Sequence, residues 1–557
     1  MVFCYLETLN VERNNMRKPD LILENVRAFT MDPAMPLACT VAIAGRRIMA
    51  VSHDPGLMIP GGPGTRRLDL GGRLLLPGFW DSHFHYYQWS MGQTYIALDQ
   101  AGSFRHCLEM IRQKMNSISS GKEIPWIQGQ GFNESDWPEN RMPLRLDLDK
   151  VCPDLPVLIW RCDLHLAVAN SKALQLGGLH DDLPDPIQGL IGRDDTGKLN
   201  GILREEAINI IKKAVPEPDP EATVSIMGKA QSGLHALGIT AIHDVRLAGN
   251  QSESALTFRS WQALAQQKKL RLRCWTSLPG EERTSVEQLG LRTGLGDEYL
   301  RVAHLKYFMD GGMGARTAWM IDPYLDTGTE GLCLIPPDQM LEEVMAADRS
   351  GLAVMIHAIG DRANRELVSI FEKTRKSRSS YSLRPSLEHR IEHVQVIRSP
   401  DLQRLARLKM PVSVQPANMV LDINMINQCA GNVGKYAYAF KSMLDAGVPV
   451  MFSSDCPVCS PDPLVGIQAA VTRARDDGNP RGGWYPEQLV SLEQAIMAYT
   501  STPAKAYNSW DVHGSISPGK FADMVVFEND LFRANPLNLK RSRVAMTIFD
   551  GKIVYEA

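Results

Sequence analysis

Two histidines with one residue between them, His83 and His85, end an apolar run at residues 74–83 that is typical of a β-strand. Side chains alternate between the two faces of a strand, so both imidazoles point to the same side. Paired imidazoles suit a borderline divalent ion such as zinc. The pair predicts part of a metal site; two hydrogen-bonded histidines without a metal are the alternative interpretation.

Lys306 lies near the end of another apolar run, at residues 300–310. Burial and a nearby metal charge would lower the pKa of its amine. A neutral amine reacts with carbon dioxide to form a carbamate, whose two oxygens can bridge two metal ions. A lysine that simply points to solvent is the alternative.

Three more side chains of metal-ligand type follow apolar runs. His357 lies in the run 352–360, His393 in 387–396 and Asp455 at the end of 448–455. Each histidine alone is compatible with a hydrogen-bonded core residue. A buried carboxylate is costly unless it is paired or binds a metal. Because all these residues end predicted strands, together they predict one metal centre.

The elements that must position these residues read as eight strands alternating with helices, which is the pattern of a (β/α)8 TIM barrel. The active-site face of such a barrel lies at the carboxyl ends of its strands. Helices are expected at 339–349, 362–375 and 491–507. The predicted strands cover 74–83, 238–245, 270–278, 300–310, 352–360, 387–396, 410–417 and 448–455.

The α/β barrel, at 74–507, is not the whole chain. The gap between the first two strands is too long for a loop and predicts an inserted α+β subdomain at about 100–235. Short alternating runs at 19–73 and 508–557 predict one β-sandwich formed by both chain ends, with a hairpin turn at Asp550-Gly551. Residues 1–18 are expected to be an extension.

Composition excludes several classes of protein. Sixty Lys and Arg against 63 Asp and Glu give a net charge of −3, which offers no electrostatic basis for binding nucleic acid or a membrane surface. Ten scattered cysteines are too few for a disulfide scaffold and are expected to be reduced thiols. No signal peptide or membrane-spanning segment is predicted. A cytoplasmic location is the expectation.

Many motifs, in order, resemble the amidohydrolase superfamily and, within it, the amidohydrolase family 3 or YtcJ-like branch, which includes N-substituted formamide deformylases. The similarity covers residues 19–557. It rests on LPGFWDSHFH at 76–85, RCDLHLAVANSKAL at 161–174, GILREEA at 201–207, LKYFMDGGMGARTAW at 305–319, IHAIGDRAN at 356–364, HRIEHVQ at 389–395, FSSDCPV at 452–458 and GSISPGKFADMVVF at 514–527.

The resemblance implies a metal centre of one or two Zn²⁺ ions, or another divalent metal, with a carbamylated Lys306 where two ions bind. Its ligands would be His83, His85, Lys306, His357, His393 and Asp455. Substrate-binding positions would be Trp137, Arg161, His165, Glu205, Asp310 and Arg316. Family habit alone suggests a homodimer.

The implied reaction is hydrolysis of a small-molecule amide, an N-substituted formamide or another small amide, at its C–N bond. A metal-activated water would attack, with Asp455 taking its proton and returning it to the leaving amine. His357 or His393 could contact the oxyanion if one metal binds. Deamination, ester or lactone hydrolysis and isomerisation are alternatives on the same barrel. A non-catalytic scaffold is the remote alternative, because such proteins lose ligands that are all present in this chain.

One departure from the family follows the last strand. Cys456 stands where a small residue is usual, giving Cys456-Pro-Val-Cys459. Redox CxxC motifs open a helix in a thioredoxin-like unit, which this context does not match. A thiol that ligates or inhibits the metal is the alternative.

Overall fold

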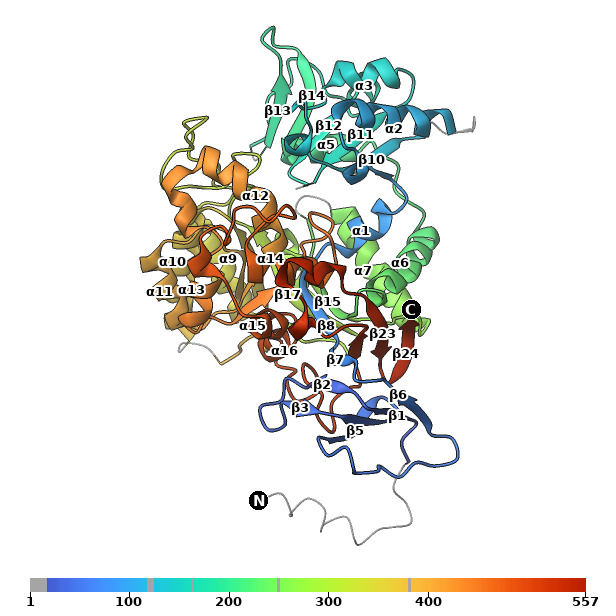
Figure 1. Ribbon diagram of the computed structural model, residues 1–557. Helices are drawn as coiled ribbons and strands as arrows, with labels where there is room; N and C mark the ends of the chain where they lie inside the picture. The colour runs from blue at the N-terminus through green and yellow to red at the C-terminus, as the bar shows by residue number, and fades with distance from the viewer. Residues whose placement is uncertain (1–17, 118–124, 163, 188, 248–250, 379–381) are drawn as a thin grey trace. The chain divides into compact units, whose positions relative to one another are not determined.

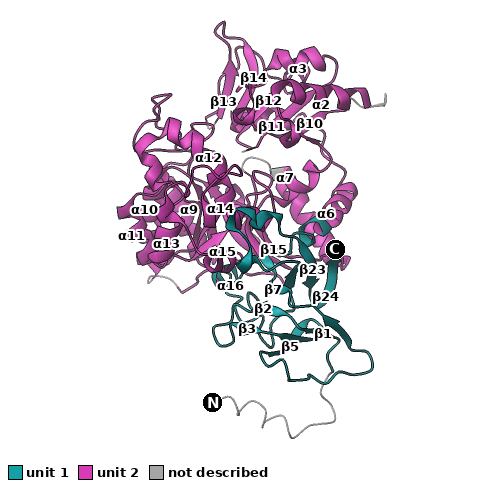
Figure 2. Ribbon diagram, in the orientation of Figure 1, with its two compact units in different colours: residues 1–79, 232–240, 500–557 teal, residues 80–231, 241–499 magenta. Residues whose placement is uncertain are grey.

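The computed structural model describes residues 18–117, 125–162, 164–187, 189–247, 251–378 and 382–557. This part of the chain forms two compact units, coloured separately in Figure 2. One contains the described residues up to Phe79, with 232–240 and 500–557. The other contains the described residues of 80–231 and 241–499. The residues predicted to do chemistry all fall in the second, larger unit.

The larger unit centres on an eight-stranded sheet, in which every ladder from β15 to β21 is parallel (Figure 1). In spatial order the strands are β8 (Phe79–Phe84), β15 (Ile239–Asp244), β16 (Arg273–Pro279), β17 (Leu300–Phe308), β18 (Ala353–Ala358), β19 (Arg390–His393), β20 (Val412–Val414) and β21 (Val450–Phe452). The sheet confirms a parallel α/β barrel.

Bonds between the first and the last strand bring the barrel close to a complete ring. The Ser82 hydroxyl of β8 donates to the Phe452 carbonyl of β21 at 2.9 Å. Just beyond β21, the Asp455 N–H donates to the His83 carbonyl at 2.9 Å. Two predicted ligands, His83 and Asp455, thus lie on either side of the seam, the junction between β8 and β21.

Strand sequences that are buried along their whole length explain why the barrel forms. All six residues of β8 and all six of β18 are buried, as expected for strands covered on both faces. The outer face packs against helices with an apolar stripe, such as Met340, Val344 and Ala347 of α9. The helices that lie between the barrel strands in the chain, or follow the last of them, include α6 (Pro220–His235), α7 (Gln251–Gln266), α8 (Arg283–Gln288), α9 (Pro337–Arg349), α10 (Asp361–Ser377), α11 (Ser399–Leu408), α12 (Pro416–Cys429), α13 (Phe440–Asp445) and α14 (Pro463–Thr472).

Two predicted elements are each interrupted. The predicted strand 74–83 is two strands, β7 (Leu74–Pro77) and β8, separated at Gly78. A Cβ at Gly78 would lie 2.3 Å from the Thr240 hydroxyl, so only glycine fits at this break. The predicted helix 491–507 is α15 (Leu492–Ala498) and α16 (Ser501–Ala506). Pro503 has no N–H for the Tyr499 carbonyl, which accepts the Trp80 N–H instead.

The insertion after β8 contains its own six-stranded sheet, with hydrophobic cores on both faces. Its strands, in spatial order, are β13 (Gly189–Arg193), β14 (Leu199–Glu205), β12 (Leu166–Ala169), β11 (Val157–Arg161), β10 (Ile127–Phe132) and β9 (Ile96–Ala97). Helices α2 (Phe104–Ser117), α3 (Arg145–Val151), α4 (Ser171–Leu176) and α5 (Glu206–Lys212) accompany them. The arrangement is α+β, as the sequence predicts.

The smaller unit contains two sheets that share one core. The first has the order β5 (Arg47–Ser52), β4 (Thr40–Ala44), β1 (Leu21–Glu24), β6 (Arg66–Asp69), and the second β24 (Lys552–Glu556), β23 (Val544–Phe549), β22 (Met524–Phe527), β7, β2 (Arg27–Phe29), β3 (Leu37–Ala38). Leu23 and Ile43 of the first sheet belong to the same core as Val526 and Ile548 of the second. Both chain ends therefore contribute strands to this unit.

No helix in the described ranges combines the length and the apolar composition that crossing a membrane requires.

Candidate metal centre

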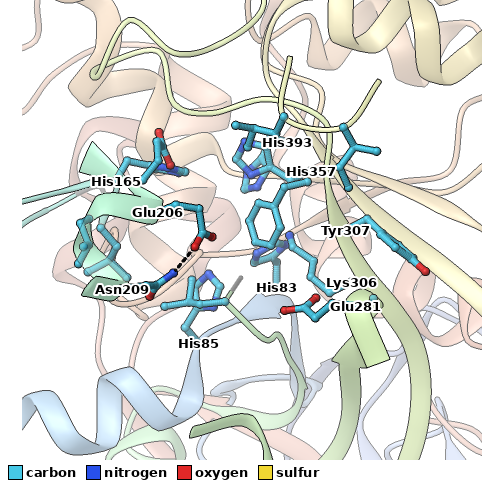
Figure 3. Close-up of a pocket in the computed structure, with 18 of the residues that line it drawn as sticks. His83, His85, His165, Glu206, Asn209, Glu281, Lys306, Tyr307, His357 and His393 are labelled. Carbon is cyan, nitrogen blue, oxygen red and sulfur yellow. Dashed lines mark hydrogen bonds and ion pairs between the residues drawn. The ribbon is translucent and has the colours of Figure 1, made fainter. Parts of the chain in front are cut away.

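A cavity of about 500 Å³ at the carboxyl ends of the barrel strands contains the predicted ligands. Figure 3 shows the imidazoles of His83, His85, His357 and His393 and the side chain of Lys306 in its lining, and Asp455 lines the same cavity. The strand register explains this convergence. Phe308 of β17 pairs with His357, and Ala358 pairs with His393, so the two histidines lie at the same end of the barrel.

The tightest group of ligand atoms comes from two strands, β8 and β19, and the turn after β21. Ligand atoms of His83, His393 and Asp455 all lie within 4.8 Å of one another, and all three side chains are buried. Asp455 Oδ1 is 3.3 Å from His83 Nε2 and 3.1 Å from His85 Nε2. Three histidines and a carboxylate at such spacings form a donor set of the kind that zinc selects.

Hydrogen bonds at the other ring nitrogen fix the orientation of three imidazoles. His83 Nδ1 donates to Glu392, His85 Nδ1 to the Val245 carbonyl at 3.0 Å, and His393 Nδ1 to Gln415 Oε1 at 2.9 Å. Each bond leaves Nε2 as the nitrogen available to a metal. Such partners commonly orient metal-ligating histidines.

Buried polar atoms without a hydrogen-bond partner indicate whether the predicted ligands fit a metal. His83 Nε2, Lys306 Nζ and Asp455 Oδ1 are all buried and have no such partner. Orphaned buried donors and acceptors are rare, because each costs free energy. A divalent cation among them would satisfy the nitrogen and the carboxylate oxygen, so these residues fit a metal.

Lys306 lies on β17 with only 2% of its surface exposed. Burial lowers the pKa of its amine to about 8, although Glu392 and Asp455 oppose this effect. Its Nζ lies 4.6 Å from the centre of the Phe308 ring. Burial thus gives Lys306 a larger neutral fraction at neutral pH than an ordinary lysine has, and the neutral amine is the form that carbamate formation requires.

Asp455 is a buried carboxyl that stays acidic. Burial alone would raise its pKa, but the adjacent His85, with His393 and Lys306, lowers the pKa below its ordinary value. Asp455 also adopts a left-handed backbone, at φ 58°, which is costly for a residue other than glycine. His393 (φ 73°) and Val394 (φ 43°) share this conformation. Non-glycine residues in this region cluster at functional sites.

His357 approaches the centre from β18. Its ring centre is 4.4 Å from that of His393. His357 Nε2 donates to the Gly311 carbonyl at 3.3 Å, which leaves Nδ1 as its ligand atom.

The predicted substrate-binding residues fall into two groups. His165, Glu205, Arg161 and Arg316 line cavities at the barrel mouth. Trp137 and Asp310 are not among the residues that line the described cavities. Trp137 belongs to the core of the insertion, and its indole N–H donates to the Ala101 carbonyl at 2.7 Å.

Asp310 is a fully buried carboxylate that holds two loops together. It accepts the backbone N–H groups of Trp319, Ile359 and Gly360 at 2.8–2.9 Å. Burial nevertheless raises its pKa to about 7. The geometry gives Asp310 a positioning role beside His357, whose Nε2 lies 3.7 Å from its Oδ1.

His165 of the insertion lies close to one of the predicted ligands. Its ring centre is 5.5 Å from that of His357. Its Nδ1 donates to Glu205 Oε2 at 2.8 Å, and the Thr317 hydroxyl donates to Glu205 Oε1 at 2.7 Å. Glu205 has a left-handed φ of 50°. Thr317, in the loop after β17, therefore holds Glu205 and, through it, His165 at the mouth of the barrel.

Sequence reasoning missed the residues that support the ligands. Glu392, which accepts from His83, is held by Arg390 through Nε at 2.5 Å and Nη2 at 2.9 Å. Asp81 accepts the Ser454 hydroxyl at 2.5 Å and so supports the turn that carries Asp455. Arg390 and Glu392 alternate on a fully buried strand; two charges on one face of such a strand were the available signal.

Cys456 and Cys459 are both buried thiols, and burial raises the pKa of each well above its ordinary value. The Cys459 thiol donates to Asn418 Oδ1. Low-pKa, accessible thiols are the reactive ones, so neither resembles a redox centre.

Comparison with known proteins agrees with the geometry. A model described as "Amidohydrolase family" matches residues 66–555. YtcJ of Bacillus subtilis (strain 168) is 28% identical over 498 residues, covering 89% of this chain and 92% of that protein. The N-substituted formamide deformylase of Arthrobacter pascens is 26% identical over 552 residues, covering 96% and 98%. The crystal structure of an uncharacterized metal-dependent hydrolase from Pyrococcus horikoshii OT3 has a TM-score of 0.73 and 25% identity, covering 93% and 99%. The similarity found in the motifs is confirmed.

Proposed function

Because this chain belongs to the amidohydrolase family, we propose that it is a zinc-dependent hydrolase that cleaves the C–N bond of an amide. One observation carries the proposal. His83 Nε2 and Asp455 Oδ1, two buried atoms without a hydrogen-bond partner, lie 3.3 Å apart at the barrel mouth beside His85 and Lys306. The name of the Arthrobacter pascens relative supports an N-substituted formamide or a similar amide as the substrate class.

The proposed ligands are the six predicted residues. His83, His85, His357, His393 and Asp455 would hold one ion or share two, and a carbamylated Lys306 would bridge a pair. The metal, when bound, supplies a Lewis acid for the carbonyl and lowers the pKa of a water.

Asp455 is proposed as the proton carrier. Its pKa is held low, so the carboxylate is ionised at neutral pH and can accept a proton from the attacking water. It then returns the proton to the leaving amine, which would otherwise depart as an unstable anion. His357 or His393 would contact the developing oxyanion if one ion binds.

The insertion is proposed to close over the substrate. His165, held by Glu205 and Thr317, lines the same cavity and would contact the substrate there. Deaminase, esterase, lactonase or isomerase activity remains an alternative for the same site.

Metal content and amide hydrolysis, measured together, test the proposal. Purified protein is analysed by plasma mass spectrometry, beside a His83→Ala/His85→Ala variant and a control, His180→Ala, which changes an exposed histidine. We expect one or two zinc equivalents in the wild type and the control and none in the double variant. N-benzylformamide and N-benzylacetamide are then assayed for released benzylamine. Protein that holds metal but cleaves no amide would refute the amidase assignment and favour the alternatives.

A further inference from the structure

Two cavities of different chemistry meet at the proposed metal centre. The 500 Å³ cavity lies on one side and a second, of about 350 Å³, on the other. His165, His357, His393 and Asp455 line both. A scissile bond held there therefore has room for a substituent on each side.

The first cavity is rich in aromatic and aliphatic groups. Trp160, Leu164, Tyr307 and Phe308 line it, and Figure 3 shows Tyr307 in its wall. Through Trp160 and Leu164 it continues into a third cavity of about 520 Å³, lined by Tyr87 and Tyr95 among others.

Two cations along this route are paired with carboxylates, and Glu206, Glu217 and Glu281 also line it. Lys212 Nζ contacts Glu253 Oε2 at 3.0 Å, and Arg283 Nε contacts Glu343 Oε2 at 2.7 Å. At the far end, two buried amide atoms, Gln88 Oε1 and Gln130 Nε2, have no hydrogen-bond partner. The route therefore suits an aromatic group with a polar tip, such as a phenol.

The cavity on the other side, which we call the carboxamide cavity, is polar and is lined by both amide and charged side chains. Its amides are Asn133, Asn140, Gln395, Asn418, Asn424 and Gln428. Its charged side chains have partners of their own: Arg161 Nε contacts Glu134 of the same lining at 2.9 Å, and Arg316 Nη2 contacts Asp326 at 2.8 Å. Asp136 accepts the Asn133 amide at 2.8 Å, and Asp422 accepts the Tyr438 hydroxyl at 2.5 Å. Amide side chains both donate and accept hydrogen bonds, so the cavity suits a polar group.

One atom of this cavity points to a ligand. Gln395 is only 4% exposed, and its Oε1 is buried without a hydrogen-bond partner. Its backbone is fixed, because the Gln395 carbonyl accepts the Tyr438 N–H at 2.6 Å. A buried acceptor without a partner is unfavourable until a donor arrives. The ligand of this cavity therefore carries an O–H or N–H.

We propose, on the basis of the amidase function above, that the substrate is a two-armed secondary amide. One arm is aromatic with a polar tip and fills the first and third cavities. The other is short and polar and carries a hydrogen-bond donor for Gln395 in the carboxamide cavity. Either arm can be the acyl part of the amide, and both directions are included in the test below. An N-substituted formamide supplies only one arm, so within the proposed class of amides we expect the two-armed member to be the better substrate.

Matched amides test the proposal on the zinc-loaded enzyme. N-(3-hydroxypropanoyl)tyramine and N-butanoyltyramine differ only in a terminal OH or CH₃. The reversed amides, N-(2-hydroxyethyl)- and N-propyl-3-(4-hydroxyphenyl)propanamide, cover the opposite direction. We expect kcat/KM for the hydroxylated member of one pair to exceed that for its partner and for N-formyltyramine by about 10-fold or more, since a buried acceptor is left unpaired otherwise.

Substitutions at Gln395 test whether this residue causes the preference for the hydroxylated amide. Gln395→Met, of similar length, should reduce the ratio within the pair to near one, whereas Gln395→Glu keeps an acceptor and should retain it. Gln262→Met, on the exposed face of α7, is the matched control and should keep the wild-type ratio. A ratio that survives Gln395→Met would overturn the assignment to this residue.

A binding measurement separates this inference from the proposed function. Ketones in which CH₂ replaces the amide N–H cannot be hydrolysed at this bond, so their Kd values, by titration calorimetry, report recognition alone. About 10-fold tighter binding of the hydroxylated ketone supports the two-armed substrate even if no amide is cleaved. Equal binding of the two ketones, together with amide hydrolysis, would refute the second arm and leave the amidase function intact.

Discussion

Glu392 is predicted to control metal affinity without touching the metal. It is fully buried, accepts from His83 Nδ1 and is held by two nitrogens of Arg390. Its two carboxylate oxygens therefore receive three donors. In Glu392→Gln one oxygen becomes an NH₂ group, so at least one of these donors faces another donor.

The expected loss follows from that count. Removing a partner that orients a metal-bound histidine typically weakens metal binding by ~10–100-fold, which equals about 1.4–2.7 kcal/mol. The assay is competition for zinc against a chromophoric chelator, with circular dichroism to check folding. Glu392→Asp keeps the charge and should fall between wild type and Glu392→Gln.

A control and a refuting result complete this test. Glu388→Gln removes a carboxylate four residues earlier whose side chain is 58% exposed, and it should leave the zinc affinity unchanged. If folded Glu392→Gln binds zinc within about 3-fold of wild type, less than the smallest loss expected, then His83 does not depend on this contact.

Three further substitutions test the remaining roles. Asp455→Asn should retain its fold and metal but lose turnover by ~10²–10⁴, measured as released amine, because it cannot accept a proton; unchanged turnover would remove the proton-carrier role. Lys306→Ala should bind less metal, measured by mass spectrometry, and added acetate should partly restore its activity. A full metal content in this variant without added acetate would refute the carbamate hypothesis. Thr317→Val should lower kcat/KM about 10-fold at unchanged metal content by releasing Glu205 and His165, whereas Thr317→Ser should restore it; a wild-type rate in the valine variant would contradict this role of Thr317.

The candidate ligands could be found from the sequence because each lies near the end of a buried strand or just after it. Period-two alternation places His83 and His85 on one side, and the parallel order places His357 and His393 at one end. Those patterns are local in the sequence, so they can be recognised without knowledge of the three-dimensional structure.

The supporting contacts could not be found in this way, because they join residues far apart in the chain. Thr317 and Glu205 are 112 residues apart, and His83 and Glu392 are 309 apart. Nothing local distinguishes Trp137, whose indole is used within the insertion's core, from an aromatic residue that faces a substrate. The break at Gly78 depends on the nearby Thr240, which no strand pattern reveals.

The seam between β8 and β21 has a consequence for how the chain matures. The bonds across it join residues 373 positions apart, such as Asp81 and Ser454. Contacts between residues so far apart in the sequence form late in folding, because closing the long intervening loop has an entropic cost. During synthesis, His83 and His85 emerge long before Asp455. Retention of the proposed zinc would therefore report the docking of the last strand on the first, and chelator-quenched refolding would time that final step.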